Sequence, residues 1–274
     1  MESPPAFGPR ARGRPTFHGF SLVELLVVIA IITILTVVAI PAFNSIKGGS
    51  DITKAAYDVA GVLDNARAYA MANNTFVYVG IAEVDSAADP SASPQTNTIS
   101  PAVGGRVVVA TVASKDGTRG YDVTSSTLPS PACWDNYNNG ANFVAIGKLH
   151  RFENVHMTAS FLDIPNSVGT SRPTVSGGTG GTGYILGSAT CTSVTPFDWP
   201  LGKAIGAGQY SFAKVINFDP QGVPRIQTAT NTDALVQNME IGLWPARGKT
   251  VPAKANAAAI QINGITGATR IYRP

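Results

Sequence analysis

The chain has 274 residues, of which 44% are hydrophobic and 14% are charged, and its formal net charge at pH 7 is +3. The first 19 residues hold three Arg and one Glu, which leaves the other 255 residues with a formal charge of +1 (+3 minus +2). This near-neutral balance excludes a strongly basic surface of the kind that binds nucleic acid, so no nucleic-acid partner is expected.

A basic leader precedes a long apolar segment. Residues 20–46 hold one formal charge, Glu24, and the stretch Leu25–Ile40 with its flanks is long enough for a membrane-spanning helix, which needs about 20 apolar residues. Arginines before such a helix favour a cytoplasmic leader, so the residues after it are expected to lie outside the cytoplasm. An acid inside a membrane helix is unfavourable by roughly 2.5–3.5 kcal/mol at the centre and by less near an end, so Glu24 is expected to have a function and a partner.

Two ordinary interpretations compete for this segment. A secretory signal peptide fits poorly, because the apolar core is longer than the usual 7–15 residues and no clear cleavage site follows it. The small residue that resembles a processing point, Gly19, stands before the apolar segment. A plain membrane anchor with a tolerated acid remains open.

The segment Gly19–Glu24 (GFSLVE), followed by the apolar run Leu25–Ile31, resembles the class III signal of type IV pilins and type II secretion pseudopilins. Pro41 stands where these proteins commonly carry a helix-kinking proline. The resemblance covers residues 1–46, and it implies a cleaved leader over residues 1–19 and a transmembrane and assembly helix over residues 20–46.

The resemblance also implies a mechanism. A prepilin peptidase would cleave between Gly19 and Phe20 and methylate the new amino group of Phe20. The mature single-pass subunit would wait in the bacterial inner membrane and then be assembled with other pilin subunits by an inner-membrane platform. Glu24 would pair with the terminal amine of a neighbouring subunit, because opposite charges attract far more strongly in a low-dielectric core than in water.

Residues 47–74 are predicted to form an amphipathic helix that continues into the globular domain. Ser50 or Asp51 is expected to restart the helix as a cap, and Asn73 and Asn74 are expected to end it. The apolar residues recur at the three- and four-residue spacing of one helix face: Ile52, Ala55, Ala56, Val59, Val62, Leu63, Ala66 and Ala70.

Residues 75–274 are predicted to form an extracytoplasmic, β-rich globular domain. Two small antiparallel sheets packed on the helix are expected, which gives an α+β, pilin-like fold. Long loops are expected over residues 85–105, 114–140 and about 164–209. The predicted strands are Thr75–Val84, Arg106–Ala113, Phe143–Arg151, Val155–Phe161, Tyr210–Phe218, Val223–Thr228, Val236–Leu243, Ala258–Ile262 and Ala268–Tyr272.

Three segments of this region resemble GspH/FimT-type minor pseudopilins. They are the Ala-Arg stretch Leu63–Ala70, the Phe-x-Pro-x-Gly turn Phe218–Gly222, and a last hairpin near Gly267 and Arg270. The hairpin departs from that family's Thr-Gly-Arg turn, because two residues separate Gly267 from Arg270, and the three loops are longer than the family's.

The turn, and the strand Ala259–Ile262 that also takes part in this resemblance, have a plain structural interpretation as well. Asp219–Gly222 is a turn sequence, in which Pro presets φ and Gly supplies an unusual φ. Ile260 and Ile262 alternate with other residues, as expected of a half-buried strand.

The two cysteines, Cys133 and Cys191, both lie in predicted loops. An even number in an extracytoplasmic domain favours one disulfide, which would stabilise the fold by roughly 4 kcal/mol in the chain-entropy model. Two unpaired thiols remain the alternative, because pairing is not given by sequence.

No credible catalytic or metal-binding arrangement is found, and neither a cofactor nor a metal is expected. His150 and His156 lack the spacing of a metal-binding helix and are predicted to be surface residues at strand ends. Ser211–Lys214 matches S-x-x-K without the accompanying motifs. The glycine-rich run 176–183 lacks the strand and helix of a nucleotide-binding fingerprint and is interpreted as a flexible loop.

The sequence therefore favours a structural subunit over an enzyme. A pilin-like subunit, most simply a minor pseudopilin, of a type II secretion pseudopilus or a type IV pilus is expected, supporting protein secretion or pilus biogenesis. Its expected partners are prepilin peptidase, other pilin subunits, the inner-membrane assembly platform and membrane lipid. A major fibre subunit and a membrane-anchored extracytoplasmic binding domain that uses a pilin-type anchor remain alternatives.

Overall fold

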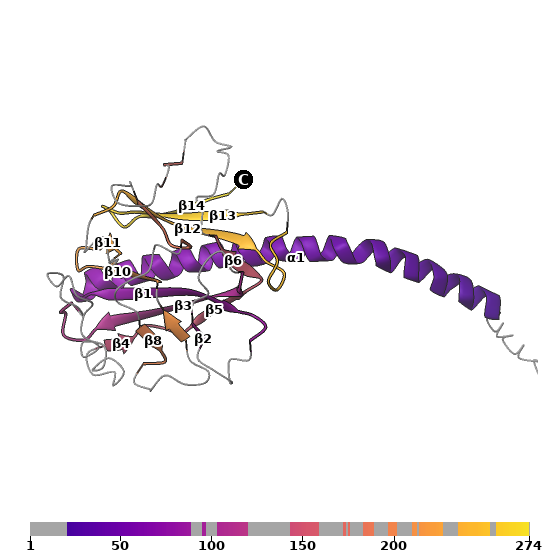
Figure 1. Cartoon of the computed structure of the whole chain (residues 1–274), viewed down its shortest axis with the longest axis horizontal. Coiled ribbons are helices and arrows are strands. Elements are labelled where there is room, and N and C mark those ends of the chain that lie inside the picture. Colours follow the sequence, from indigo (N-terminus) through magenta and orange to yellow (C-terminus); the bar gives the residue numbers. More distant parts are fainter. Residues whose placement is uncertain are drawn as a thin grey trace, which may run out of the picture. The chain divides into compact units, whose positions relative to one another are not determined.

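The computed structural model describes residues 21–88, 95–96, 103–119, 143–158, 172–173, 175, 183–188, 197–201, 210–212, 214–226, 235–252 and 256–273. Within these residues the chain forms one helix and three sheets, so the fold is α+β, as predicted (Figure 1). The chain divides into two compact units, Met1–Ser45 and Ile46–Pro274.

Helix α1 (Leu22–Asn73) runs without a break and includes Pro41. Its predicted end is confirmed: Asn74 adopts a φ of 48°, in the left-handed region that Asn tolerates after a helix. The helix does not restart at Ser50 or Asp51, because the backbone is helical through both residues and the two predicted helical segments run on as one. The carboxylate of Asp51 instead accepts a hydrogen bond from Nδ2 of Asn154 at 3.0 Å.

The six-stranded sheet has the order β11-β10-β1-β3-β4, and β5 also pairs with β3. The strands β1 and β3 form the longest pairing, from Val77 opposite Ala113 to Asp85 opposite Gly105. The predicted strand over residues 143–151 is split into β4 and β5, with Gly147 at a φ of 73° between them. The bounds are β1 Val77–Asp85, β3 Gly105–Ser114, β4 Phe143–Ala145, β5 His150–Glu153, β10 Lys214–Phe218 and β11 Pro224–Arg225.

The five-stranded sheet has the order β14-β13-β12-β6, and β7 pairs with β12. The β7–β12 pair is parallel, so the sheet is not wholly antiparallel as predicted. The bounds are β6 Val155–Met157, β7 Gly183–Ile185, β12 Asn238–Pro245, β13 Ala258–Asn263 and β14 Thr269–Tyr272.

A third, three-stranded sheet was not predicted. It has the order β2-β9-β8 and is built from Gln95–Thr96, Tyr210–Phe212 and Phe197–Trp199. The predicted strand over residues 210–218 is divided between two sheets, because β9 belongs to this sheet and β10 to the six-stranded one. The expected number of two sheets is therefore wrong.

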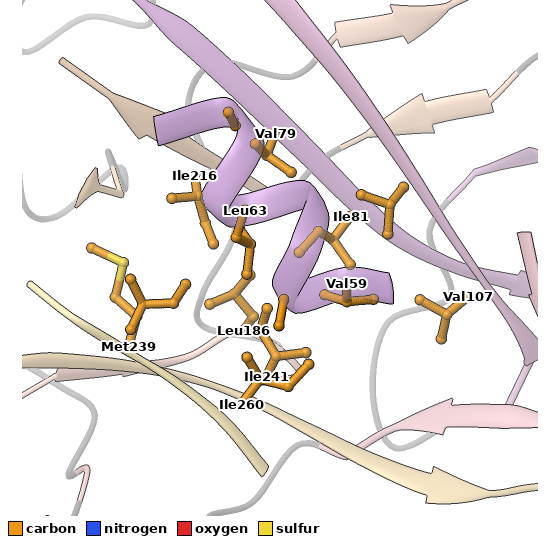
Figure 2. Packing of buried hydrophobic residues seen from close by; sticks show 14 of the residues in the cluster. Val59, Leu63, Val79, Ile81, Val107, Leu186, Ile216, Met239, Ile241 and Ile260 are labelled. Atoms are coloured by element: carbon orange, nitrogen blue, oxygen red, sulfur yellow. The ribbon is translucent and has the colours of Figure 1, made fainter. Parts of the chain in front are cut away.

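The core of the larger unit lies on both sides of the second half of α1. Figure 2 shows Val59 and Leu63 of α1 among apolar side chains of the six-stranded and five-stranded sheets. The labelled sheet residues are Val79, Ile81, Val107 and Ile216 on one sheet, and Met239, Ile241 and Ile260 on the other. The predicted apolar helix face is thus confirmed as core.

The strands β1, β3 and β10 of the six-stranded sheet are buried on both faces. The second face of this sheet packs against the three-stranded sheet, where the rings of Phe197 and Phe212 lie 4.9 Å apart over Gly80. A sheet covered on both faces has apolar residues in near-continuous runs, which explains the runs in β1 and β3. The prediction of a half-buried strand around Ile260 and Ile262 is likewise wrong, because every residue of Ala258–Ile262 is buried.

Candidate functional site

The first candidate site is the start of α1. The N–H of Leu25 donates to the carbonyl oxygen of Ser21 at 3.1 Å, which makes Ser21 the N-cap residue. Glu24 therefore lies in the first helical turn, at the spacing of a capping box and at the positive end of the helix dipole. The predicted cleavage-site residues Gly19 and Phe20 lie outside the described residues.

The segment that follows, residues 22–37, is apolar all round and exposed all round. The exposed fractions of its large apolar side chains range from 44% at Val28 to 79% at Leu22. A helix that is hydrophobic on every side is normally buried in a core or a membrane. Within the described residues, none of the helices has the length and hydropathy needed to cross a membrane.

The threonine hydroxyls of this segment form hydrogen bonds within the helix, and Glu24 is the exception among its polar side chains. The hydroxyl of Thr33 donates to the carbonyl oxygens of Ile29 and Ala30, and that of Thr36 donates to Ile32 at 2.7 Å. Glu24 is the one charged residue among residues 20–46, and it is exposed. The segment thus presents an apolar surface with a single acid at its start.

A second arrangement joins three segments that are far apart in sequence: the stretch Leu63–Ala70, the turn Phe218–Gly222 and the hairpin near Gly267. Gly222 has a φ of 78° in the turn after β10, and Gly267 has a φ of 70° in the β13–β14 hairpin. A Cβ at Gly267 would lie 2.3 Å from the carbonyl oxygen of Gly222 and 2.8 Å from Cδ of Arg67. A Cβ at Gly222 would lie 3.2 Å from Cγ of Arg67. The Ala-Arg stretch of α1 and both turns therefore meet at one place.

The predicted turn at Asp219–Gly222 is confirmed. The N–H of Gly222 donates to the carbonyl oxygen of Asp219 at 2.8 Å. The carboxylate of Asp219 accepts from the N–H groups of Gln221 and Val223 at 3.0 and 2.9 Å. This carboxylate holds the loop closed in the way typical of Asp in turns.

A buried acid was missed by sequence reasoning. Glu83 accepts backbone hydrogen bonds from Gly104, Gly105 and Met157 at 2.6, 3.1 and 2.9 Å. It also contacts Nδ1 of His156, at 2.9 and 3.0 Å from the two carboxylate oxygens. The available signal was an acidic residue within the run Val77–Val84, whose other residues are uncharged. Because β1 and β6 belong to different sheets, Glu83 connects the two.

This contact corrects the prediction for His156. The residue is 8% exposed, so it is a buried structural partner and not a surface residue. His150 is partly buried and stacks on Phe152 with ring centroids 6.3 Å apart. In the part of the chain that the structure describes, no three His, Cys, Asp or Glu residues are grouped as a metal site requires.

The remaining sequence motifs are the S-x-x-K match, the glycine-rich run and the two cysteines. Ser211 and Lys214 lie in different sheets, and the buried Lys214 ammonium donates to the carbonyl oxygen of Ser188. Of the glycine-rich run, the described residue is Gly183, which begins β7. Cys133 and Cys191 lie outside the described residues, so the disulfide stays a prediction.

Comparison with known proteins gives one match. A family model described as the prokaryotic N-terminal methylation motif matches residues 14–40. The matched range includes Gly19, Phe20 and Glu24. No curated protein and no solved structure matches the chain.

Proposed function

We propose, from the type IV pilin-like prepilin signal that residues 14–40 carry, that this chain is a minor pseudopilin-like subunit. Prepilin peptidase cleaves it between Gly19 and Phe20 and methylates Phe20. The subunit then joins other pilin subunits in a type II secretion pseudopilus or a type IV pilus. It supports protein secretion or pilus biogenesis and carries out no catalysis itself.

The observation that carries this function is the exposed apolar surface of residues 22–37 with Glu24 at its start. Full burial of one large apolar side chain is favourable by about 1.5–3 kcal/mol, so this surface is strongly driven out of water. We place it first in the lipid of the inner membrane, with the globular unit outside the cytoplasm, and then among the helices of neighbouring subunits.

Glu24 determines how the helices of neighbouring subunits align when the segment moves from lipid into the assembly. Lipid tails are as apolar as the side chains of the segment, so contact between helices needs a further source of specificity. Cleavage after Gly19 creates a positive amine on Phe20, and a neighbour's amine satisfies the acid when two subunits align. An unpaired charge in a low-dielectric core is strongly penalised, so misaligned subunits are disfavoured. The inner-membrane assembly platform would deliver the subunits for this pairing.

The meeting of Arg67 with Gly222 and Gly267 supports the minor-pseudopilin assignment. The three segments that resemble GspH/FimT-type proteins are far apart in sequence and converge in the fold. Shared packing gives each of these segments a structural reason to occur with the others. The three long loops predicted between the strands are not part of that resemblance, because they are longer than the loops of GspH/FimT-type proteins.

The test is the N-terminal mass of the protein purified from its native membrane. The expected mass is that of a chain beginning at Phe20 with one added methyl group. A functional chain that still begins at Met1 would overturn the proposal. A plain membrane anchor, the competing function, predicts a mature chain without that N-terminus and without any need for Glu24.

A further inference from the structure

A cavity of about 230 Å³ lies on the five-stranded sheet. Its lining includes three carboxamides, a guanidinium, a phenol ring and a hydroxyl: Asn238, Gln261, Asn263, Arg270, Tyr272 and Thr266. These residues come from β12, β13, β14 and the β13–β14 connection. The proposed function uses none of them.

The pleat of the sheet places these side chains on the face away from α1. Ile260 and Ile262 of β13 point into the core beside α1, so Gln261 and Asn263 project from the opposite face. Strand pairing sets Asn238 opposite Asn263, and Gln261 opposite Arg270. Figure 1 shows β12, β13 and β14 side by side, with β14 at the edge of the sheet.

The floor of the cavity is held by buried polar contacts. Gln261 donates from Nε2 to Glu240 at 3.0 Å and to the carbonyl oxygen of Pro173 at 2.7 Å. Glu240 has no exposed surface and also contacts the guanidinium of Arg172 at 3.4 Å. The amide oxygen of Asn263 accepts from the N–H of Thr266 at 2.8 Å. These contacts fix two of the three carboxamides before any ligand binds, which lowers the entropic cost of binding.

One wall of the cavity is apolar. Tyr272 packs with Trp244 around the buried Ala257 and Ala259, on the same face of the sheet. The cavity therefore combines an aromatic wall with a polar floor. Aromatic rings offer a large, rigid apolar surface at a small loss of conformational entropy.

This combination limits the class of ligand. A cation is disfavoured because the guanidinium of Arg270 lines the cavity, and because the carboxylate of Glu240 beneath it is engaged by Gln261 and Arg172. A purely apolar ligand would leave the remaining hydrogen-bonding capacity of the carboxamides unused, which is unfavourable. Carboxamides both donate and accept hydrogen bonds, as hydroxyl groups do. A ring that bears several hydroxyls and has an apolar face matches both surfaces.

We infer that this face of the five-stranded sheet binds a saccharide. One sugar ring rests against Tyr272, and its hydroxyls bond to the carboxamides of Asn238 and Asn263. The guanidinium of Arg270 binds a ring hydroxyl or, in a uronate, the carboxylate, with which it makes paired hydrogen bonds. This binding does not depend on the apolar segment of α1 or on assembly.

The test uses the full chain in a detergent without a sugar headgroup. The protein is screened on an array of neutral hexoses, N-acetylhexosamines and uronates, and the best ligand is then titrated by calorimetry. Saturable binding is expected, with affinity at least tenfold weaker for Arg270→Ala and for Tyr272→Ala. The matched controls Arg247→Ala and Tyr57→Ala change exposed residues outside the cavity and should leave the affinity unchanged.

Thermal unfolding of each variant checks that the fold is retained. Arg270 is exposed, so its replacement leaves the core intact. The inference is overturned if no saccharide on the array binds, or if both cavity variants bind as well as the parent. Loss of association with another protein subunit in these variants, without sugar binding, would make this face a protein interface and would also overturn it.

Discussion

Gly222 and Gly267 approach so closely that a single methyl group on Gly267 would stand 2.3 Å from the carbonyl oxygen of Gly222. The two residues belong to different turns, one after β10 and the other between β13 and β14. These strands lie in different sheets, and the side chain of Arg67 from α1 contacts both glycines. The helix and both sheets therefore pack closely against one another at this point.

Replacement of Gly267 by Ala tests this close packing. The left-handed φ of 70° should cost about 1–2 kcal/mol. Forced movement of Gly222 and Arg67 should add about 1–3 kcal/mol. The matched control is Gly147→Ala, at a φ of 73° with no atom within 4 Å of the added methyl group. Urea unfolding should show the larger loss of stability for Gly267, and equal losses would contradict the close contact.

Glu83→Gln tests the buried connection between the sheets. The amide of Gln has one acceptor oxygen, so its NH₂ group must face either the N–H groups of Gly104 and Gly105 or that of Met157. A buried donor without an acceptor should lower the free energy of unfolding by about 1–3 kcal/mol. Chemical denaturation measures this loss.

The control for that change is Glu153→Gln. Glu153 forms an ion pair with Arg106 at 2.6 Å, but its side chain is half exposed. Such a surface pair contributes less than about 1 kcal/mol. A Glu83 variant as stable as the Glu153 variant would show that the buried contacts add nothing.

The pH dependence of one surface loop follows from its hydrogen bonds. The N–H and hydroxyl of Thr118 and the hydroxyl of Ser114 lower the pKa of Asp116 from 3.8 to about 2. A pKa below the unfolded value means that the ionised form stabilises the native loop above pH 3.8. This stabilisation is lost as the pH falls from 3.8 towards 2. NMR titration of the carboxyl group should give the low midpoint, and Thr118→Val should raise it.

Glu24→Gln separates two roles of the acid at the start of α1. Gln is compatible with a Ser N-cap three residues before it, as Glu is, but it carries no charge. If the charge aligns subunits, the variant should enter the membrane normally and be lost from sheared filaments, as seen by immunoblotting of the two fractions. Thr33→Val is the control, because its hydroxyl bonds only within the helix. Normal incorporation of the Glu24 variant would reject the docking role.

Sequence patterns predicted the features that depend on neighbouring residues. The apolar face of α1, its end at Asn73, the presence of strands β1 and β3 and the Asp219–Gly222 turn all follow from local spacing and turn chemistry. Gly19 and Glu24 likewise stand in a short motif, and the matched methylation motif covers both.

Features that depend on distant contacts were missed. The strand Phe197–Trp199 has three residues and gains its pairing from β9, so no local pattern marks it. His156 looked like a surface residue because its partner, Glu83, lies 73 positions away. The burial of Ala259 on the outer face of β13 depends on the cover that Trp244 and Tyr272 provide there.

The unbroken course of α1 has a mechanical consequence. The same helix begins in the exposed apolar segment of residues 22–37 and ends in the core between the sheets. Tension applied at the leading end is therefore delivered to the middle of the fold rather than to a peripheral strand. Such loading shears many side-chain contacts at once, so the folded head should withstand extraction forces that would peel an edge strand away.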